Sequence, residues 1–148
     1  MIKHNKLFEY GVLSYIGGTT YVTMEVFARQ YSHWSMFICG MLCFIGIGLI
    51  NKILPWSTPI WIQMVIGGFG IVTPLEFITG CIVNIQLGWH VWNYTCQPNI
   101  LGQISLKSSI GWCFLSLIGI LLDDYIRYWF FNEQKPKYIF LYKKGIRV

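Results

Sequence analysis

Residues Trp56 to Gly102 read WSTPIWIQMVIGGFGIVTPLEFITGCIVNIQLGWHVWNYTCQPNILG, and this stretch decides the fold. It is an almost uncharged apolar run that carries a single carboxylate, Glu76, and ends in a polar, aromatic loop. An ionised carboxylate at membrane depth costs roughly 3 kcal/mol on insertion scales. We therefore expect Glu76 to face protein or trapped water, or to be protonated, and we take it as the first functional candidate.

The composition of the whole chain indicates an integral membrane protein. Hydrophobic residues make up 55% of it and charged residues only 11%, whereas a soluble domain carries roughly a quarter charged side chains. A chain of 148 residues has room for about four helices of ~20 residues with short loops. No separate soluble catalytic domain would fit.

Four apolar runs predict an all-α fold, a bundle of about four transmembrane helices with a long aromatic loop on the outer side. The predicted spans are approximately 8–28, 35–51, 59–88 and 108–128. We expect residues 1–131 to form the transmembrane domain and residues 132–148 a basic cytoplasmic tail. The protein would be a multi-pass protein of the cell membrane.

The first apolar run has some features of a signal peptide. No small-x-small cleavage site is clear, however, and Glu25 and Arg29 follow the run directly, so we interpret it as a retained helix. Ser14 and Gly18 form a pair of small residues at a spacing that lets a neighbouring helix approach closely.

The third span is longer than a bilayer needs. From Pro59 to about Gly88 it would measure roughly 43 Å at 1.5 Å per residue, against a hydrocarbon core of ~30 Å. Pro74 lies two residues before Glu76 and removes a backbone hydrogen bond, which predicts a kink at that point. A bend beside a carboxylate suits the wall of a cavity.

Two sets of residues form the candidate functional site. The expected lining of a polar cavity in the outer half of the bundle consists of Glu25, Arg29, Glu76, Asn93 and Tyr94. The expected cap from the outer loop consists of Trp92, Asn99, Gly102 and Gln103.

Each part of this site also has a structural interpretation. Glu25 and Arg29 are four residues apart on one helix, which is the spacing of an ordinary ion pair. Glu76 has no charged neighbour in sequence, so a partner would come from another helix, and Arg29 could serve both acids. Trp92 and Tyr94 also suit an aromatic belt at the level of the lipid headgroups.

Several classes of function have no characteristic motif in this sequence. The sequence contains no P-loop, no GxGxxG and no zinc-type cysteine spacing, so we expect no enzyme activity, no cofactor and no metal site. Four of the five cysteines lie in apolar runs and would behave as small hydrophobic side chains. The net charge of +5 comes largely from the C-terminal flank, which suits anionic lipid rather than nucleic acid.

Six segments together resemble the ABC-transporter type IV, or permease-like, family of small Firmicutes membrane proteins: YSHWSMFICGMLCFIGIGLIN, ILPW, PLEFITGCIVN, WNYT, NILGQI and LLDDYIRYWF. The most recognisable are the E-F/Y-x-x-G segment, here Glu76 to Gly80, and the W-D-Y-S segment, here Trp92 to Thr95. The resemblance implies a helical membrane fold and a permease-like role. Asn93 stands where the family has aspartate, and Lys107 ends the segment that is otherwise I-C-L-P, which weakens the case for a cation site in this loop.

Two hypotheses for the function follow. The first is a permease-like component of a small-solute transport system, which would work in the bilayer as a homo-oligomer or with other membrane subunits and a separate ATPase subunit. The second is a non-transporting membrane scaffold or regulator that recruits a partner through its basic tail.

The distribution of Lys and Arg predicts that both termini are cytoplasmic. Nine basic residues flank the spans on the inner side and only Arg29 and Lys107 lie on the outer side, and basic residues accumulate on the cytoplasmic side of a membrane. A cysteine introduced at position 140 should resist membrane-impermeant thiol reagents in intact cells and react after lysis. Labelling from outside intact cells would contradict this topology.

Overall fold

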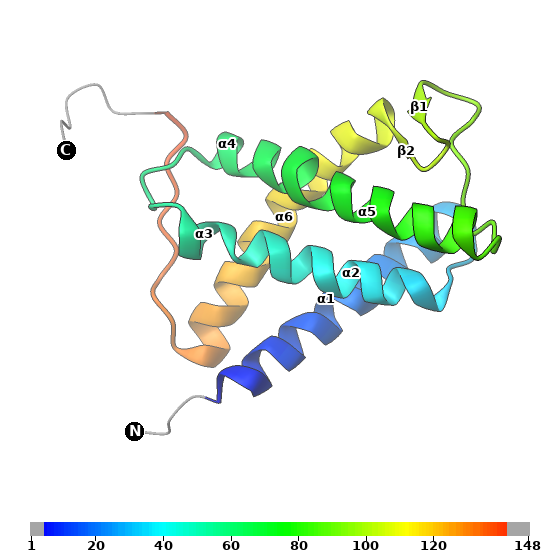
Figure 1. The fold of residues 1–148 in the computed structure, drawn as a ribbon. Helices are drawn as coiled ribbons and strands as arrows, with labels where there is room; N and C mark the ends of the chain where they lie inside the picture. Colours follow the sequence, from blue (N-terminus) through cyan, green and yellow to red (C-terminus); the bar gives the residue numbers. More distant parts are fainter. Residues whose placement is uncertain (1–4, 142–148) are drawn as a thin grey trace.

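Helices make up nearly all the regular structure of the computed structural model, which describes residues 5–141 (Figure 1). The prediction of a mostly helical chain is confirmed. The elements, in chain order, are α1 (Lys6–Arg29), α2 (Trp34–Gly48), α3 (Ile50–Ile53), α4 (Ile60–Val65), η1 (Ile66–Val72), α5 (Thr73–Gly80), η2 (Cys81–Gln86), β1 (Asn99–Ile100), β2 (Ile104–Ser105) and α6 (Leu106–Phe131). η1 and η2 are π-helical, and β1 pairs with β2 in an antiparallel hairpin.

These elements form four helical rods, and three of them are long and apolar enough to cross a membrane. The three are Trp34–Ile53, Ile60–Gln86 and Leu106–Phe131. The remaining rod, α1, is the first in the chain. It has 24 residues but carries several hydroxyl groups and two acids, and it is not among the three. The predicted first transmembrane span therefore stays a prediction.

The second rod lies at the centre of the bundle. α2 packs against α1, η1, α5 and α6. Figure 1 shows the third rod, from α4 to η2, lying along α2, while α6 crosses the third rod and α1 crosses α2. α2 contributes more side chains to the hydrophobic core than any other helix, among them Met36, Phe44 and Ile47, which are at most 6% exposed.

The crossing of α1 and α2 depends on two glycines. A Cβ added to Gly17 would lie 2.3 Å from Cβ of Phe44, and a Cβ added to Gly40 would lie 2.4 Å from Cβ of Tyr21. Gly18 packs against the ring of Phe37, as the predicted small pair requires. The closest backbone approach, however, is made by Gly17 and Gly40.

The third rod is irregular where the sequence predicts a kink. η1 ends directly before α5, and the N–H of Thr73 donates to the carbonyl of Gly68, five residues earlier. Pro74 has no N–H and its ring crowds the carbonyl four residues before it. A wider π turn accommodates both effects, because it adds a residue to the turn before the proline.

The glycine crossing generates a direct test of the packing. Gly17→Ala should lower the free energy of unfolding by about 1–3 kcal/mol, because an extra methyl group cannot fit there without moving backbone. Gly11 is the matched control on α1, since nothing lies within 4 Å of a Cβ added to it. Gly11→Ala should be neutral or stabilising by up to about 1 kcal/mol. Thermal unfolding in mild detergent measures both, and equal effects would contradict the crossing.

Candidate functional site

A cavity of about 450 Å³ lies at the end of the bundle that carries Arg29 and the loop between η2 and β1. We call this end the loop end, and the space the loop-end cavity. All five residues that the sequence predicts for a polar cavity line it: Glu25, Arg29, Glu76, Asn93 and Tyr94. They come from α1, α5 and the loop, so the fold brings together residues up to 69 positions apart.

Glu76 is turned into the bundle and is only 2% exposed. Its Oε2 accepts a hydrogen bond from Nε1 of Trp112 at 2.7 Å, and its Oε1 accepts one from the hydroxyl of Tyr94 at 3.1 Å. Both donors are neutral. Among the described residues no Lys, Arg or His forms an ion pair with Glu76.

Arg29 is paired with Glu25 and not with Glu76. Its Nη2 lies 2.5 Å from Oε1 of Glu25, and its Nη1 donates to the carbonyl of Val91 at 3.0 Å. Ser32 donates to the other oxygen of Glu25 at 2.6 Å. Among the described residues Arg29 forms its ion pair with Glu25 and none with Glu76, so the prediction that it could serve both acids is not supported by a direct contact.

The loop between η2 and β1 folds over the cavity, but only part of the predicted cap touches it. Trp92 lines the cavity and donates from its indole nitrogen to the carbonyl of Gln103 at 2.8 Å. Gln103 is itself held by Asn84, whose amide donates to it at 2.8 Å. Asn99 and Gly102 do not line the cavity. They shape the turn between β1 and β2, where the N–H of Gly102 donates to Oδ1 of Asn99.

Asn84 was missed by reasoning from the sequence. It is 8% exposed on η2, and its Oδ1 accepts from the N–H of Val91 at 2.7 Å. A polar residue inside an apolar run is the signal that could have found it. Asn84 ties the loop to the third rod and so positions Trp92 above the cavity.

Tyr94 keeps its proton at any ordinary pH. Burial of the phenol and the neighbouring charge of Glu76 raise the pKa of Tyr94 well above its usual range. The hydroxyl therefore remains a donor to Glu76. Asn93, by contrast, accepts a hydrogen bond at its Oδ1 from the backbone N–H of Thr95. This contact forms an Asx-type turn.

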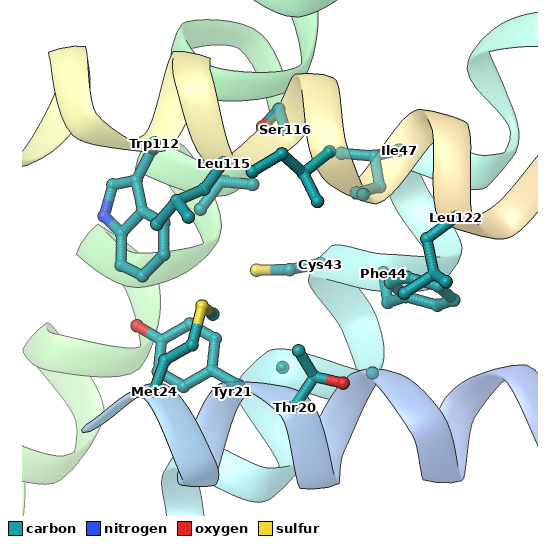
Figure 2. A pocket seen from close by; sticks show the side chains of 15 residues that line it. Thr20, Tyr21, Met24, Cys43, Phe44, Ile47, Trp112, Leu115, Ser116 and Leu122 are labelled. Atoms are coloured by element: carbon teal, nitrogen blue, oxygen red, sulfur yellow. The ribbon is translucent and has the colours of Figure 1, made fainter. Parts of the chain in front are cut away.

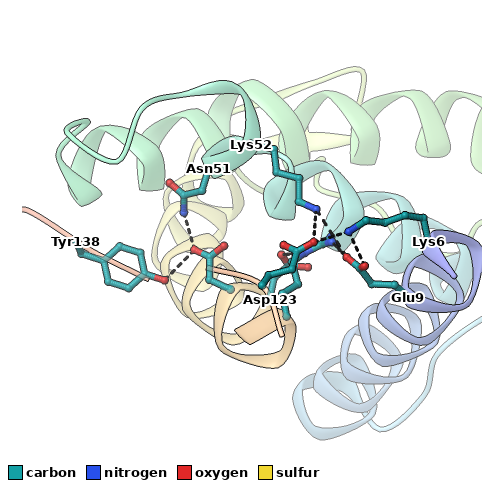
Figure 3. A network of polar contacts seen from close by, with 9 residues as sticks. Lys6, Glu9, Asn51, Lys52, Asp123 and Tyr138 are labelled. Carbon is teal, nitrogen blue, oxygen red and sulfur yellow. Dashed lines mark hydrogen bonds and ion pairs between the residues drawn. The ribbon is translucent and has the colours of Figure 1, made fainter. Parts of the chain in front are cut away.

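A second polar cluster, at the opposite end of the bundle, was also missed (Figure 3). Arg127 donates from Nε to Asp123 at 2.6 Å and from Nη1 to Glu9, and all three side chains are at most 2% exposed. Lys6 and Lys52 add ion pairs to Glu9 and Glu133. We call these six residues the ion network: Lys6, Glu9, Lys52, Asp123, Arg127 and Glu133.

The ion network connects distant parts of the chain. It joins α1, α3 and α6 to the segment after α6, which also docks through a hydrogen bond of 2.8 Å from Tyr138 to Asp124. The Asp123 to Arg127 spacing of four residues was visible in the sequence. Both residues looked like the polar flank of a span, and Glu9 gave no sign that it would reach Arg127.

A smaller, apolar cavity of about 90 Å³ lies between the two clusters (Figure 2). α1 and α6 form its sides and α2 forms its floor. We call it the central groove. Tyr21, Met24, Trp112 and Leu115 line both this groove and the loop-end cavity, so the two spaces adjoin.

Comparison with known proteins gives one match. The family described as “Putative ABC-transporter type IV” matches residues 6–142. No curated protein and no solved structure matches the chain.

The ion network predicts a defined loss of stability in acid. Partial burial acts to raise the pKa of Glu133, but hydrogen bonds from Lys6 and Lys52 lower it, to about 2 from the ordinary 4.5. Because the pKa is lower in the folded state, this stabilisation is present above about pH 4.5 and is lost as the pH falls toward 2. The thermal midpoint should fall across that window, and less steeply in Glu133→Gln. Identical slopes would show that Glu133 does not titrate in this way.

Proposed function

The chain belongs to the ABC-transporter type IV family, and from that premise we propose that it is a permease-like, membrane-embedded component of a small-solute transport system. The loop-end cavity would be its solute site. The single observation that carries this proposal is the Glu76 carboxylate, which lines a cavity of about 450 Å³ with no cationic partner among the described residues.

An unpaired carboxylate in an apolar bundle is costly to maintain. Ionisable residues inside membrane proteins are rare, and they commonly mark pathways for solutes, ions or protons. Glu25 and Arg29 line the same cavity but neutralise each other. Glu76 is therefore the group that is available for a cationic group of a solute or for a proton.

Two hydroxyl groups of α1 are hydrogen-bonded within the helix itself, which supports the proposal that α1 lies in the bilayer. Thr19 and Thr23 donate to the carbonyls of the residues four positions before them, both at 2.7 Å. Groups that face lipid must be satisfied within their own segment. α1 therefore has no hydroxyl at these two positions that needs water, although its hydropathy is lower than that of the other rods.

Transport by this chain requires other subunits. The loop-end cavity lies at one end of the bundle, and the ion network joins the helices at the other end. The sequence has no nucleotide-binding motif, so a separate ATPase subunit would supply the energy. A homo-oligomer or further membrane subunits would complete the path.

The second candidate function is a non-transporting scaffold or regulator that recruits a partner through its tail. The docked segment after α6 favours it, because Glu133 and Tyr138 fix the start of the tail on the bundle. The basic residues Lys143, Lys144 and Arg147 lie outside the described residues. In this alternative Glu76 would only position the loop through Tyr94.

Purification of the complex from native membranes separates the two functions. We expect the intact chain to retain an ATPase subunit in mild detergent, with ATP hydrolysis that depends on Glu76. A chain truncated after residue 141 is the control, because the scaffold alternative predicts that partners are lost with the tail. Recovery of tail-dependent partners without any ATPase would contradict the transport proposal.

Removal of the charge at Glu76 should abolish this activity and leave the fold intact. In Glu76→Gln the amide oxygen can accept from Trp112 and the amide nitrogen can donate to Tyr94, while Arg29 keeps Glu25. The free energy of unfolding should therefore change by less than about 1 kcal/mol. Glu25→Gln is the comparison, and it should destabilise more because Arg29 loses its partner. A large loss of stability in Glu76→Gln would support the scaffold alternative, in which Glu76 positions the loop through Tyr94.

A further inference from the structure

The central groove opens sideways between α1 and α6. Thr20 and Met24 of α1 face Leu115 and Leu122 of α6 across it, with Cys43, Phe44 and Ile47 of α2 as its floor (Figure 2). Leu122 is 39% exposed and Leu115 is 37% exposed, so the side chains at its edge reach the outer surface of the bundle. In a bilayer this surface faces hydrocarbon chains.

The groove adjoins the loop-end cavity. Tyr21 and Trp112 stand at the junction, with their rings stacked at 5.2 Å between centroids. Trp112 also donates to Glu76. The apolar groove and the polar loop-end cavity thus meet at Trp112, which is in direct contact with the Glu76 carboxylate.

The loop-end cavity has the chemistry of an ammonium site. Five aromatic side chains line it: Tyr21, Tyr31, Trp92, Tyr94 and Trp112. Aromatic faces attract ammonium groups, and cages of aromatic rings recognise methylated amines. Two carboxylates and one guanidinium also line the cavity, and among the described residues the Glu76 carboxylate has no cation as an ion-pair partner. An ammonium head would be such a partner, and this role does not depend on Asn93.

The loop end also carries exposed aromatic side chains of the kind found at the level of lipid headgroups. His33, Trp34 and Trp89 cluster there, with Trp34 and Trp89 at 5.5 Å between ring centroids and exposed by 60% and 42%. Amphipathic rings of this kind lie at the boundary between lipid headgroups and hydrocarbon. The polar cavity is therefore at the depth of lipid heads, and the groove continues into the depth of their chains.

We propose that the solute is an amphiphile with an ammonium head, which binds with its head in the loop-end cavity beside Glu76 and its hydrocarbon chain in the central groove. It enters sideways from the bilayer, between α1 and α6. This inference rests on the proposed function and names the substrate class of the same site.

Binding to the purified protein in lipid nanodiscs tests the inference. The probe is dodecyltrimethylammonium, followed through quenching of tryptophan fluorescence by a brominated form of its chain. We expect saturable binding that is at least about tenfold tighter than that of tetramethylammonium, which has the head without the chain, or of dodecyl maltoside, which has the chain without the charge.

Three variants separate the head site from the groove. Glu76→Gln should weaken binding about tenfold or more, since the charge contact with the head is lost. Thr20→Phe should also weaken it, because the added ring fills the groove that Thr20 lines. Thr23→Phe is the matched control one turn away: Thr23 is exposed and lines neither space, so binding should be unchanged.

Several results would overturn the inference. Equal binding of tetramethylammonium would show that the groove is not used, and equal binding of dodecyl maltoside would show an unspecific crevice. Cross-linking between copies through a cysteine at position 20, with no amphiphile bound, would assign the groove to a second copy of the chain. If the complex retains its ATPase but fails these binding tests, only the substrate class is wrong. If no ATPase is retained, the proposed function fails.

Discussion

The Arg127 guanidinium, held between Glu9 and Asp123, is the interaction on which the arrangement of the bundle depends. It joins α1 to α6 at one end of the molecule, with all three side chains removed from solvent. Charges this deeply buried are tolerated only when they are paired, and loss of one partner typically costs about 3–5 kcal/mol. Gly48 of α2 makes room for this arrangement, since a Cβ there would lie 2.4 Å from the Asp123 carboxylate. The two ion pairs of Arg127 and the absence of a side chain at Gly48 thus allow α1, α2 and α6 to pack together at this end.

The same attachment explains why the other end is hollow. α1 and α6 are joined through Glu9 and Arg127, and α1 crosses α2 at Gly17 and Gly40. Beyond this crossing, α1 and α6 line first the central groove and then the loop-end cavity around Glu76. At the ion-network end, Glu9, Asp123 and Glu133 are all ion-paired with cations. At the loop end, Glu76 has only two neutral donors.

Composition and local spacing were enough to predict the mostly helical fold, and they drew attention to the proline and the carboxylate of the third rod. These features depend on short stretches of sequence, such as the unbroken apolar runs and the proline two residues before the carboxylate. The Glu9 to Arg127 pair spans 118 positions, and no spacing rule reaches that far. Asn84 and Gln103 act through a loop whose path depends on where the third rod ends. The partner of Arg29 could not be chosen from sequence either, because Glu25 and Glu76 both lay within plausible reach until the rods were placed.

For the function that we propose, the order of these features along α6 limits how a solute can move. Trp112 touches the cavity, Ser116 and Leu122 line the groove, and Asp123 and Arg127 close the far end. At 1.5 Å per residue, Trp112 and Arg127 are about 22 Å apart along the helix axis, which is shorter than a hydrocarbon core of ~30 Å. A solute that moved straight through the bundle would have to break the desolvated Arg127 pairs. A solute that leaves sideways through the groove meets a mainly apolar lining and no charged side chain. The cheaper path is lateral, and a lateral path suits a solute that is itself partly hydrocarbon.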